Sequence, residues 1–124
     1  MERAYLTTMS LLIFHQIDAA YWKEWEMFHL PGGVQGYLVF NIIAIPILLN
    51  GYRHLIRQSE RAKIYSYICG TLGVITFLLH AAFAAFGASQ FDLPLSILII
   101  VLCFLSGAWQ LILTMQFSTQ SSRP

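Results

Sequence analysis

Four long apolar segments with short connections between them are the feature that most constrains this chain. They run from Tyr5 to about Trp22, from Val34 to Tyr52, from Ile64 to about Ala85 and from Leu93 to about Phe117. An α-helix needs about 20 mainly apolar residues to cross roughly 30 Å of hydrocarbon. We therefore predict an all-α protein with a single integral membrane domain, 1–124, and helices at about 5–29, 34–54, 62–87 and 93–117.

The charge content agrees with a membrane protein. Charged residues make up 10% of the chain and hydrophobic residues 57%, whereas an ordinary soluble domain has about 25% charged residues. The net charge of +1 provides no general field that attracts nucleic acid, and no basic run alternates with aromatic residues. Nucleic-acid binding is therefore excluded.

Short connections also predict the topology. Consecutive helices joined by a few residues must run antiparallel, which gives a transmembrane up-down four-helix bundle. Pro31-Gly32-Gly33 breaks the chain before the second helix. Pro46 should kink that helix, which membrane helices tolerate when their neighbours satisfy the freed carbonyl.

The basic residues predict the orientation. Arg53, Arg57, Arg61 and Lys63 lie in or beside the loop between the second and third segments. By parity, Arg3 and Arg123 belong to the same side, so six of the seven basic residues share one face. Cytoplasmic loops are rich in Lys and Arg, and we therefore expect both termini to be cytoplasmic.

Small and polar residues form stripes along three of the predicted helices. At about 100° per residue, one face of the first helix carries Thr8, His15, Asp18, Trp22, Glu26 and His29, provided that the helix continues past Trp22; Gln16 and Glu24 point elsewhere. The corresponding face of the third carries Ser66, Cys69, Gly73, Thr76, His80, Ala84 and Gly87, and that of the fourth carries Asp92, Ser96, Cys103, Ser106, Gly107, Gln110 and Thr114. Membrane helices associate through small residues and interhelical hydrogen bonds, so we interpret these stripes as the packed faces.

The ionisable residues among them need a further explanation, because a charged group inside a membrane costs several kcal/mol unless it is paired. At 1.5 Å per residue, His15 and Asn41 each lie about 10 Å below the outer ends of their helices, and Asp18 about half as deep. His80 falls in the outer third of its helix. These four residues, with Glu26 and His29 one level higher, form a candidate polar site.

Three interpretations of the polar site remain open. His15, Asp18 and His80 can bind one divalent metal ion with an open position for water, or share a proton. Alternatively, His15 and Asp18 bond to each other and to Asn41 or His80 as a clasp that specifies helix register. In a third interpretation, His15 and His80 are the axial ligands of a haem b.

The segment from His15 to Phe28 is similar to a known pattern. It resembles the first helix of a family of small bacterial four-helix membrane proteins of unknown function, with the motif H-E-x-D-A followed by E-W. His15, Asp18, Ala19 and the pair Glu24-Trp25 match the motif, whereas Gln16 replaces its acidic residue. The resemblance implies an architecture and a site location in the bacterial inner membrane, and no reaction.

Two classes of function follow. The first is a membrane protein that binds a metal or handles protons, whether or not it is an enzyme. The second is a non-catalytic scaffold or interaction subunit whose polar stripes hold the bundle, a second copy of the chain or another membrane protein. In both classes the lipid bilayer is the surrounding partner.

Overall fold

The computed structural model describes residues 1–120, with side chains as far as Phe117, and Arg123 lies outside this range. Within it the chain is all-helical and has no strand, as the apolar pattern predicts. The helices are α1 (Glu2–Tyr21), α2 (Glu24–Met27), α3 (Gly33–Ile56), α4 (Ala62–Ala85) and α5 (Pro94–Gln120).

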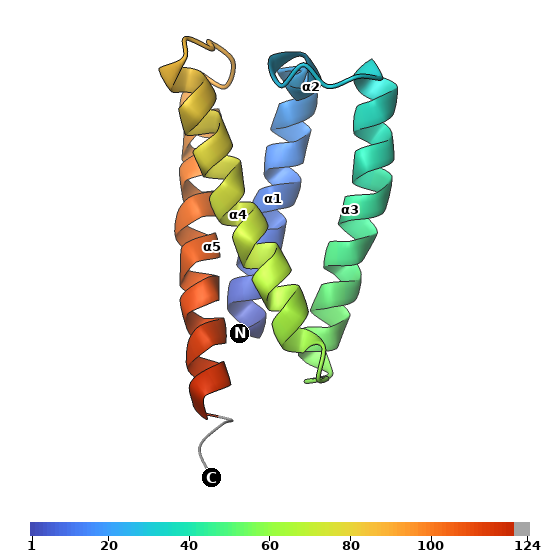
Figure 1. Ribbon diagram of the computed structural model, residues 1–124, viewed down its shortest axis with the longest axis vertical. Helices are drawn as coiled ribbons and strands as arrows, with labels where there is room; N and C mark the ends of the chain where they lie inside the picture. The colour runs from blue at the N-terminus through green and yellow to red at the C-terminus, as the bar shows by residue number, and fades with distance from the viewer. Residues whose placement is uncertain (121–124) are drawn as a thin grey trace.

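The four long helices lie side by side, and each runs opposite to the long helix before it (Figure 1). α4 makes its most extensive contacts with α5, and α1 packs against α3, α4 and α5. α2 connects α1 to α3 at one end of the molecule, while the amino terminus and the α3–α4 turn lie at the other. α3 and α4 are close at their turn and diverge toward α2 (Figure 1).

Three of these helices, and not the predicted four, are candidate membrane spans in the described part of the chain. α3, α4 and residues Pro94–Phe117 of α5 are long and apolar enough to cross a bilayer. α1 has 20 residues, but Thr7, Thr8, His15, Gln16 and Asp18 lower its hydropathy. Of the four spans that the sequence predicts, three are therefore supported by length and hydropathy.

The first helix also ends earlier than the expected helix at 5–29. α1 ends at Tyr21, and Lys23 adopts a left-handed conformation with φ of 51° before α2 begins at Glu24. A left-handed residue cannot continue a right-handed helix, so the chain changes direction here. The helical-wheel positions predicted for residues after Trp22 therefore do not hold.

The outward faces of the long helices are apolar. Large side chains such as Ile42 (69% exposed), Leu95 (66%) and Ile17 (67%) point away from the protein. The exposed positions of α1 are largely apolar as well, and include Leu6 and Phe14. A surface of this kind is far larger than the apolar patches of soluble monomers and is suited to hydrocarbon.

Close packing joins α4 to α5. A Cβ atom on Gly107 would lie 2.6 Å from the carbonyl oxygen of Gly70, so only glycine fits there. Ser66 Oγ lies 2.7 Å from Thr114 Oγ1, and the side-chain amide of Gln110 donates to the carbonyl of Ser66 at 2.9 Å. Most of the small and polar residues in the predicted stripes of these two helices therefore lie on packed faces, as the sequence predicts, whereas Ala84, Gly87 and Asp92 are exposed.

Candidate metal centre

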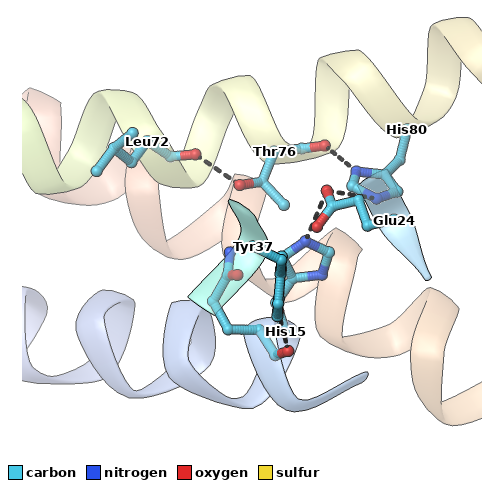
Figure 2. Close-up of polar contacts among 7 residues, drawn as sticks. His15, Glu24, Tyr37, Leu72, Thr76 and His80 are labelled. Carbon is cyan, nitrogen blue, oxygen red and sulfur yellow. Dashed lines mark hydrogen bonds and ion pairs between the residues drawn. The ribbon is translucent and has the colours of Figure 1, made fainter. Parts of the chain in front are cut away.

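Three ionisable side chains converge beneath α2. His15 comes from α1, Glu24 from α2 and His80 from α4, and one ligand atom from each lies within 4.8 Å of the other two. The two histidines are 1% and 8% exposed, and the Glu24 side chain is 13% exposed. Figure 2 shows the Glu24 carboxylate between the two imidazoles.

The carboxylate bridges the histidines at nearly equal distances. Glu24 Oε1 lies 3.6 Å from His15 Nε2 and 3.5 Å from His80 Nε2. In a tetrahedral zinc site with bonds of about 2.0–2.1 Å, two ligand atoms lie about 3.3–3.4 Å apart. Both contacts are thus close to metal-site geometry, and binding an ion requires the two imidazoles to move somewhat closer.

A backbone hydrogen bond fixes the orientation of His80. Its Nδ1 lies 2.7 Å from the carbonyl oxygen of Thr76, one turn earlier on α4. Because a carbonyl only accepts, Nδ1 carries the proton and the lone pair of the neutral ring lies on Nε2, which faces Glu24. Metal-binding histidines commonly donate their second ring nitrogen to a carbonyl in this way.

The backbone turn at Lys23 brings Glu24 to the site. Because Lys23 is left-handed, the chain folds back at the end of α1 and directs Glu24 toward His15. The Lys23 side chain points outward and lies 3.9 Å from Glu26, with both side chains 62% exposed. Among the described residues, the ion pairs of Glu24 are therefore with His15 and His80.

Aromatic rings close one side of the cluster. The ring of Phe91, which is 4% exposed, lies 4.5 Å from that of His80 and 5.6 Å from that of His15 between centroids. Phe28 contacts His80 at 5.7 Å. The opposite side borders a cavity of about 400 Å³ between α1, α3 and α4. The cavity therefore provides space for a ligand beside the cluster.

The structure places Asp18 in a different set of contacts. Asp18 Oδ1 accepts hydrogen bonds from Ser96 Oγ at 3.0 Å and from Trp22 Nε1 at 3.2 Å. It links α1 to α5 and is not in the group of converging ligand atoms. The predicted ligand set of His15, Asp18 and His80 thus keeps its two histidines near one point, where the geometry supplies Glu24 as the third group.

The other predicted site residues divide into two groups. Asn41 lines the cavity and donates from Nδ2 to the carbonyl of Tyr37 at 2.9 Å. Glu26 and His29 are exposed, because the helix that was expected to carry them inward ends at Tyr21. The structure therefore does not bring Glu26 or His29 into the site.

Haem b ligation by the two histidines does not fit this arrangement. Two axial imidazoles lie on opposite faces of a porphyrin, with the whole macrocycle between them. Here the rings of His15 and His80 meet edge to face with centroids 4.8 Å apart. Glu24 lies beside both rings, where the porphyrin would have to pass.

Sequence reasoning missed Glu24, because an uninterrupted helix directs this residue away from His15. One signal in the sequence marks it. Glu24-Trp25 matches the second element of the motif that the sequence resemblance places after His15.

Comparison with known proteins identifies the chain only by family. No curated protein and no solved structure matches it. A family described as being of unknown function, DUF6713, matches residues 1–117. This agrees with the expectation of a family without an assigned activity, and the chain belongs to DUF6713.

Proposed function

We propose that this protein is a membrane-embedded four-helix bundle that binds one divalent transition-metal ion through His15, Glu24 and His80. The single observation that carries the proposal is the convergence of these three ligand atoms, within 4.8 Å of one another, on a buried point. Two imidazoles and a carboxylate are the donor set of many catalytic zinc sites and of non-haem iron oxygenases. His15, Glu24 and His80 all line the cavity and would hold the ion beside it.

The apolar exterior supports the membrane placement. α1 lies alongside three candidate spans, and its polar residues Thr8 and His15 are buried, while its outward residues are largely apolar. α1 therefore shares the depth of its neighbours in the bilayer. Arg3 and the basic α3–α4 turn lie at the end opposite α2. By the positive-inside tendency this end is cytoplasmic, and the metal site lies in the outer half of a bacterial inner membrane.

Burial of Glu24 supports a bound cation. A carboxylate removed from water is costly unless a positive charge and hydrogen bonds compensate it. The groups beside Glu24 are two imidazoles, and His80 Nδ1 already donates elsewhere. A divalent ion between the three groups would compensate the carboxylate and use the lone pair of His80. A divalent ion held by these residues would supply an activated water near neutral pH, and with it hydrolytic chemistry.

Metal stoichiometry tests the proposal. The purified protein is stripped with a chelator, loaded with Zn²⁺, passed through gel filtration and measured by mass spectrometry of the elements. We expect one ion per chain. His15→Ala and Glu24→Gln should lose it, because changing only an outer partner of a ligand costs about 10–100-fold in affinity, and removing a ligand costs more.

Two exposed residues on the same part of the chain provide matched controls. Glu26→Gln changes a glutamate two positions from Glu24, and His29→Ala removes an exposed histidine. Both should retain the ion. Cobalt substitution adds a spectroscopic readout, since the visible absorption of Co²⁺ reports its ligands. Absence of stoichiometric metal from the wild type, or equal loss in Glu24→Gln and Glu26→Gln, would contradict the proposal.

A structural role without a metal is the second candidate, and hydrogen bonds between helices favour it. Thr8 Oγ1 lies 2.6 Å from Ser106 Oγ, and Ser96 donates to Asp18 at 3.0 Å, so α1 and α5 are joined at two levels. In this case the protein is a scaffold or subunit for a second copy or another membrane protein. His15→Ala would then lower thermal stability equally with and without Zn²⁺. Stabilisation by Zn²⁺ that His15→Ala abolishes would exclude this candidate.

A further inference from the structure

The cavity beside the His15, Glu24 and His80 cluster has two chemically different ends. Its volume of about 400 Å³ lies in the range of sites for small organic ligands. Near α2 its lining includes polar residues such as Glu24 and Asn41 beside apolar ones, whereas farther along the helices it is lined by Leu12, Ala44 and Leu48. From Asn41 to Leu48 the axis of α3 extends about 10 Å at 1.5 Å per residue. The cavity is therefore long, with one polar end.

The polar end contains atoms without partners. His15 Nδ1 and His80 Nε2 have no hydrogen-bond partner in the described structure, although both residues are more than nine-tenths buried. The side-chain oxygens of Gln16 and Asn41 also have none. All four residues line the cavity. Buried polar atoms are rarely left unpaired. His80 Nε2 is the lone pair assigned to the proposed ion, and the atoms of His15, Gln16 and Asn41 indicate a ligand that supplies hydrogen-bond donors.

The wall of the cavity is exposed between α3 and α4. Phe40 on α3 is 55% exposed, and Ile75 and Leu79 on α4 are 42% and 44% exposed, and all three line the cavity. These are the helices that diverge toward α2 (Figure 1). In a membrane an apolar opening on this side faces lipid chains rather than water.

We propose that the cavity binds a single-chain amphiphile taken from the bilayer, with its hydrocarbon chain between α3 and α4 and a small hydroxyl or amide head at Gln16, Asn41 and the cluster. The inference rests on the proposed membrane placement and names the substrate class of the proposed site. Lateral entry is favoured because the exposed rim is apolar. The head faces the cluster because the unpaired acceptors lie at that end.

Fluorescence quenching tests the binding. Wild-type protein in phospholipid nanodiscs is titrated with stearoyl ethanolamide that carries two bromine atoms on its chain, because bromine quenches a tryptophan that it contacts. Trp25 lines the cavity, whereas Trp109 on α5 is 57% exposed. We expect saturable quenching that Trp25→Phe removes. Unlabelled stearoyl ethanolamide should reverse it.

Variants locate the chain and the head. Ala44→Phe fills the cavity and should abolish saturable quenching, whereas Ala82→Phe, at an exposed position of α4 outside the cavity lining, should not. Asn41→Leu removes an acceptor and should weaken ethanolamide binding about tenfold. It should leave binding of the brominated stearoyl methyl ester, which has no donor, unchanged. If Ala44→Phe does not fold, the Asn41→Leu comparison still tests the assignment.

Two results would overturn the inference. One is quenching that does not saturate, or that brominated phosphatidylcholine reproduces, because ordinary annular lipid then explains it. The other is full binding by folded Ala44→Phe. Quenching is also measured on Glu24→Gln, to separate loss of the metal from loss of the amphiphile.

The metal proposal alone fails if the wild-type protein binds no metal but shows saturable quenching. The amphiphile proposal alone fails if the wild-type protein binds stoichiometric metal but shows no saturable quenching.

Discussion

Across the α4–α5 contact, the helices approach until Gly107 and Gly70 leave no room for a side chain. Between α3 and α4 the helices diverge, and a cavity of about 400 Å³ remains. Ser66 and Thr114 bond to each other in the first region, whereas His15 and His80 in the second retain unpaired nitrogens. Among the described residues, the packed region leaves one buried side-chain oxygen, that of Gln110, without a partner, whereas the cavity side leaves four buried atoms unpaired, on His15, Gln16, Asn41 and His80. The contrast therefore separates the part of the bundle that holds the fold from the part that is available for a ligand.

The largest expected effect is the loss of stability when a substitution disrupts the α4–α5 contact. In Gly107→Leu the new side chain meets the Gly70 carbonyl and the backbone of Val74, and we expect a loss of about 3 kcal/mol or more in the free energy of unfolding. Thermal unfolding in detergent measures it. Ala82→Leu, at an exposed position of α4, is the control. A Gly107→Leu protein as stable as this control would mean that the close α4–α5 contact does not exist.

The second prediction concerns the cavity side of the bundle, which contains the His15, Glu24 and His80 cluster. It is the increase in the free energy of unfolding when Zn²⁺ binds. At a Zn²⁺ concentration 100 times its dissociation constant, binding to the folded state adds about 2.7 kcal/mol. We expect this stabilisation in the wild type and in Gly107→Ala, if the latter folds, because the site lies outside the α4–α5 contact. Glu24→Gln should show none, whereas Glu26→Gln should respond as the wild type does. A Zn²⁺ response that survives in Glu24→Gln contradicts the assignment of this residue.

Asp18 tests where the boundary between the two regions lies. Asp18→Ala removes the acceptor of Ser96 and Trp22 and should cost about 1–3 kcal/mol, because it leaves partly buried donors unpaired. Its Zn²⁺ stoichiometry should remain that of the wild type. Asp18→Asn retains an acceptor oxygen and should lose less stability. Loss of the metal in Asp18→Asn with unchanged stability would restore Asp18 as a ligand and remove it from the packing side.

Many features of the fold and of the candidate site could be predicted from the sequence, and those that could not have identifiable physical causes. Apolar length and helical periodicity were enough to predict the helical class, the packed glycines and serines of α4 and α5, and a polar layer containing both His15 and His80. Local backbone geometry at Lys23 was not predictable, because lysine carries no signal for a left-handed turn.

That single backbone conformation accounts for the main differences at the site. It ends α1 at Tyr21, exposes Glu26 and His29, and directs Glu24 inward. Helical periodicity assumes an unbroken helix, so Glu24, Glu26 and His29, which follow the break within the expected helix 5–29, were assigned to incorrect faces. The number of candidate spans differs for another reason. α1 buries Thr8 and His15 against the other helices, and total hydropathy does not record which side polar residues face.

The smallest expected effect is at the link between α1 and α3, where the ligand-binding side is held together. The Tyr37 hydroxyl donates to the backbone carbonyl of Gln16, and Tyr37 lines the cavity. Tyr37→Phe should cost about 1 kcal/mol, the usual net value of one hydrogen bond. The carbonyl of Gln16 lies within α1, so losing the tyrosine leaves the helix itself intact. Thermal unfolding measures the cost, and Thr8→Val, which removes a bond of α1 to α5, provides a comparison of similar size.

Ligand affinity separates the two variants. If only the cavity side binds the ligand, Tyr37→Phe should also change the affinity for brominated stearoyl ethanolamide, and Thr8→Val should not. Equal effects of the two variants on that affinity would show that the bundle responds as one unit, and that the distinction between a packing side and a ligand-binding side does not hold.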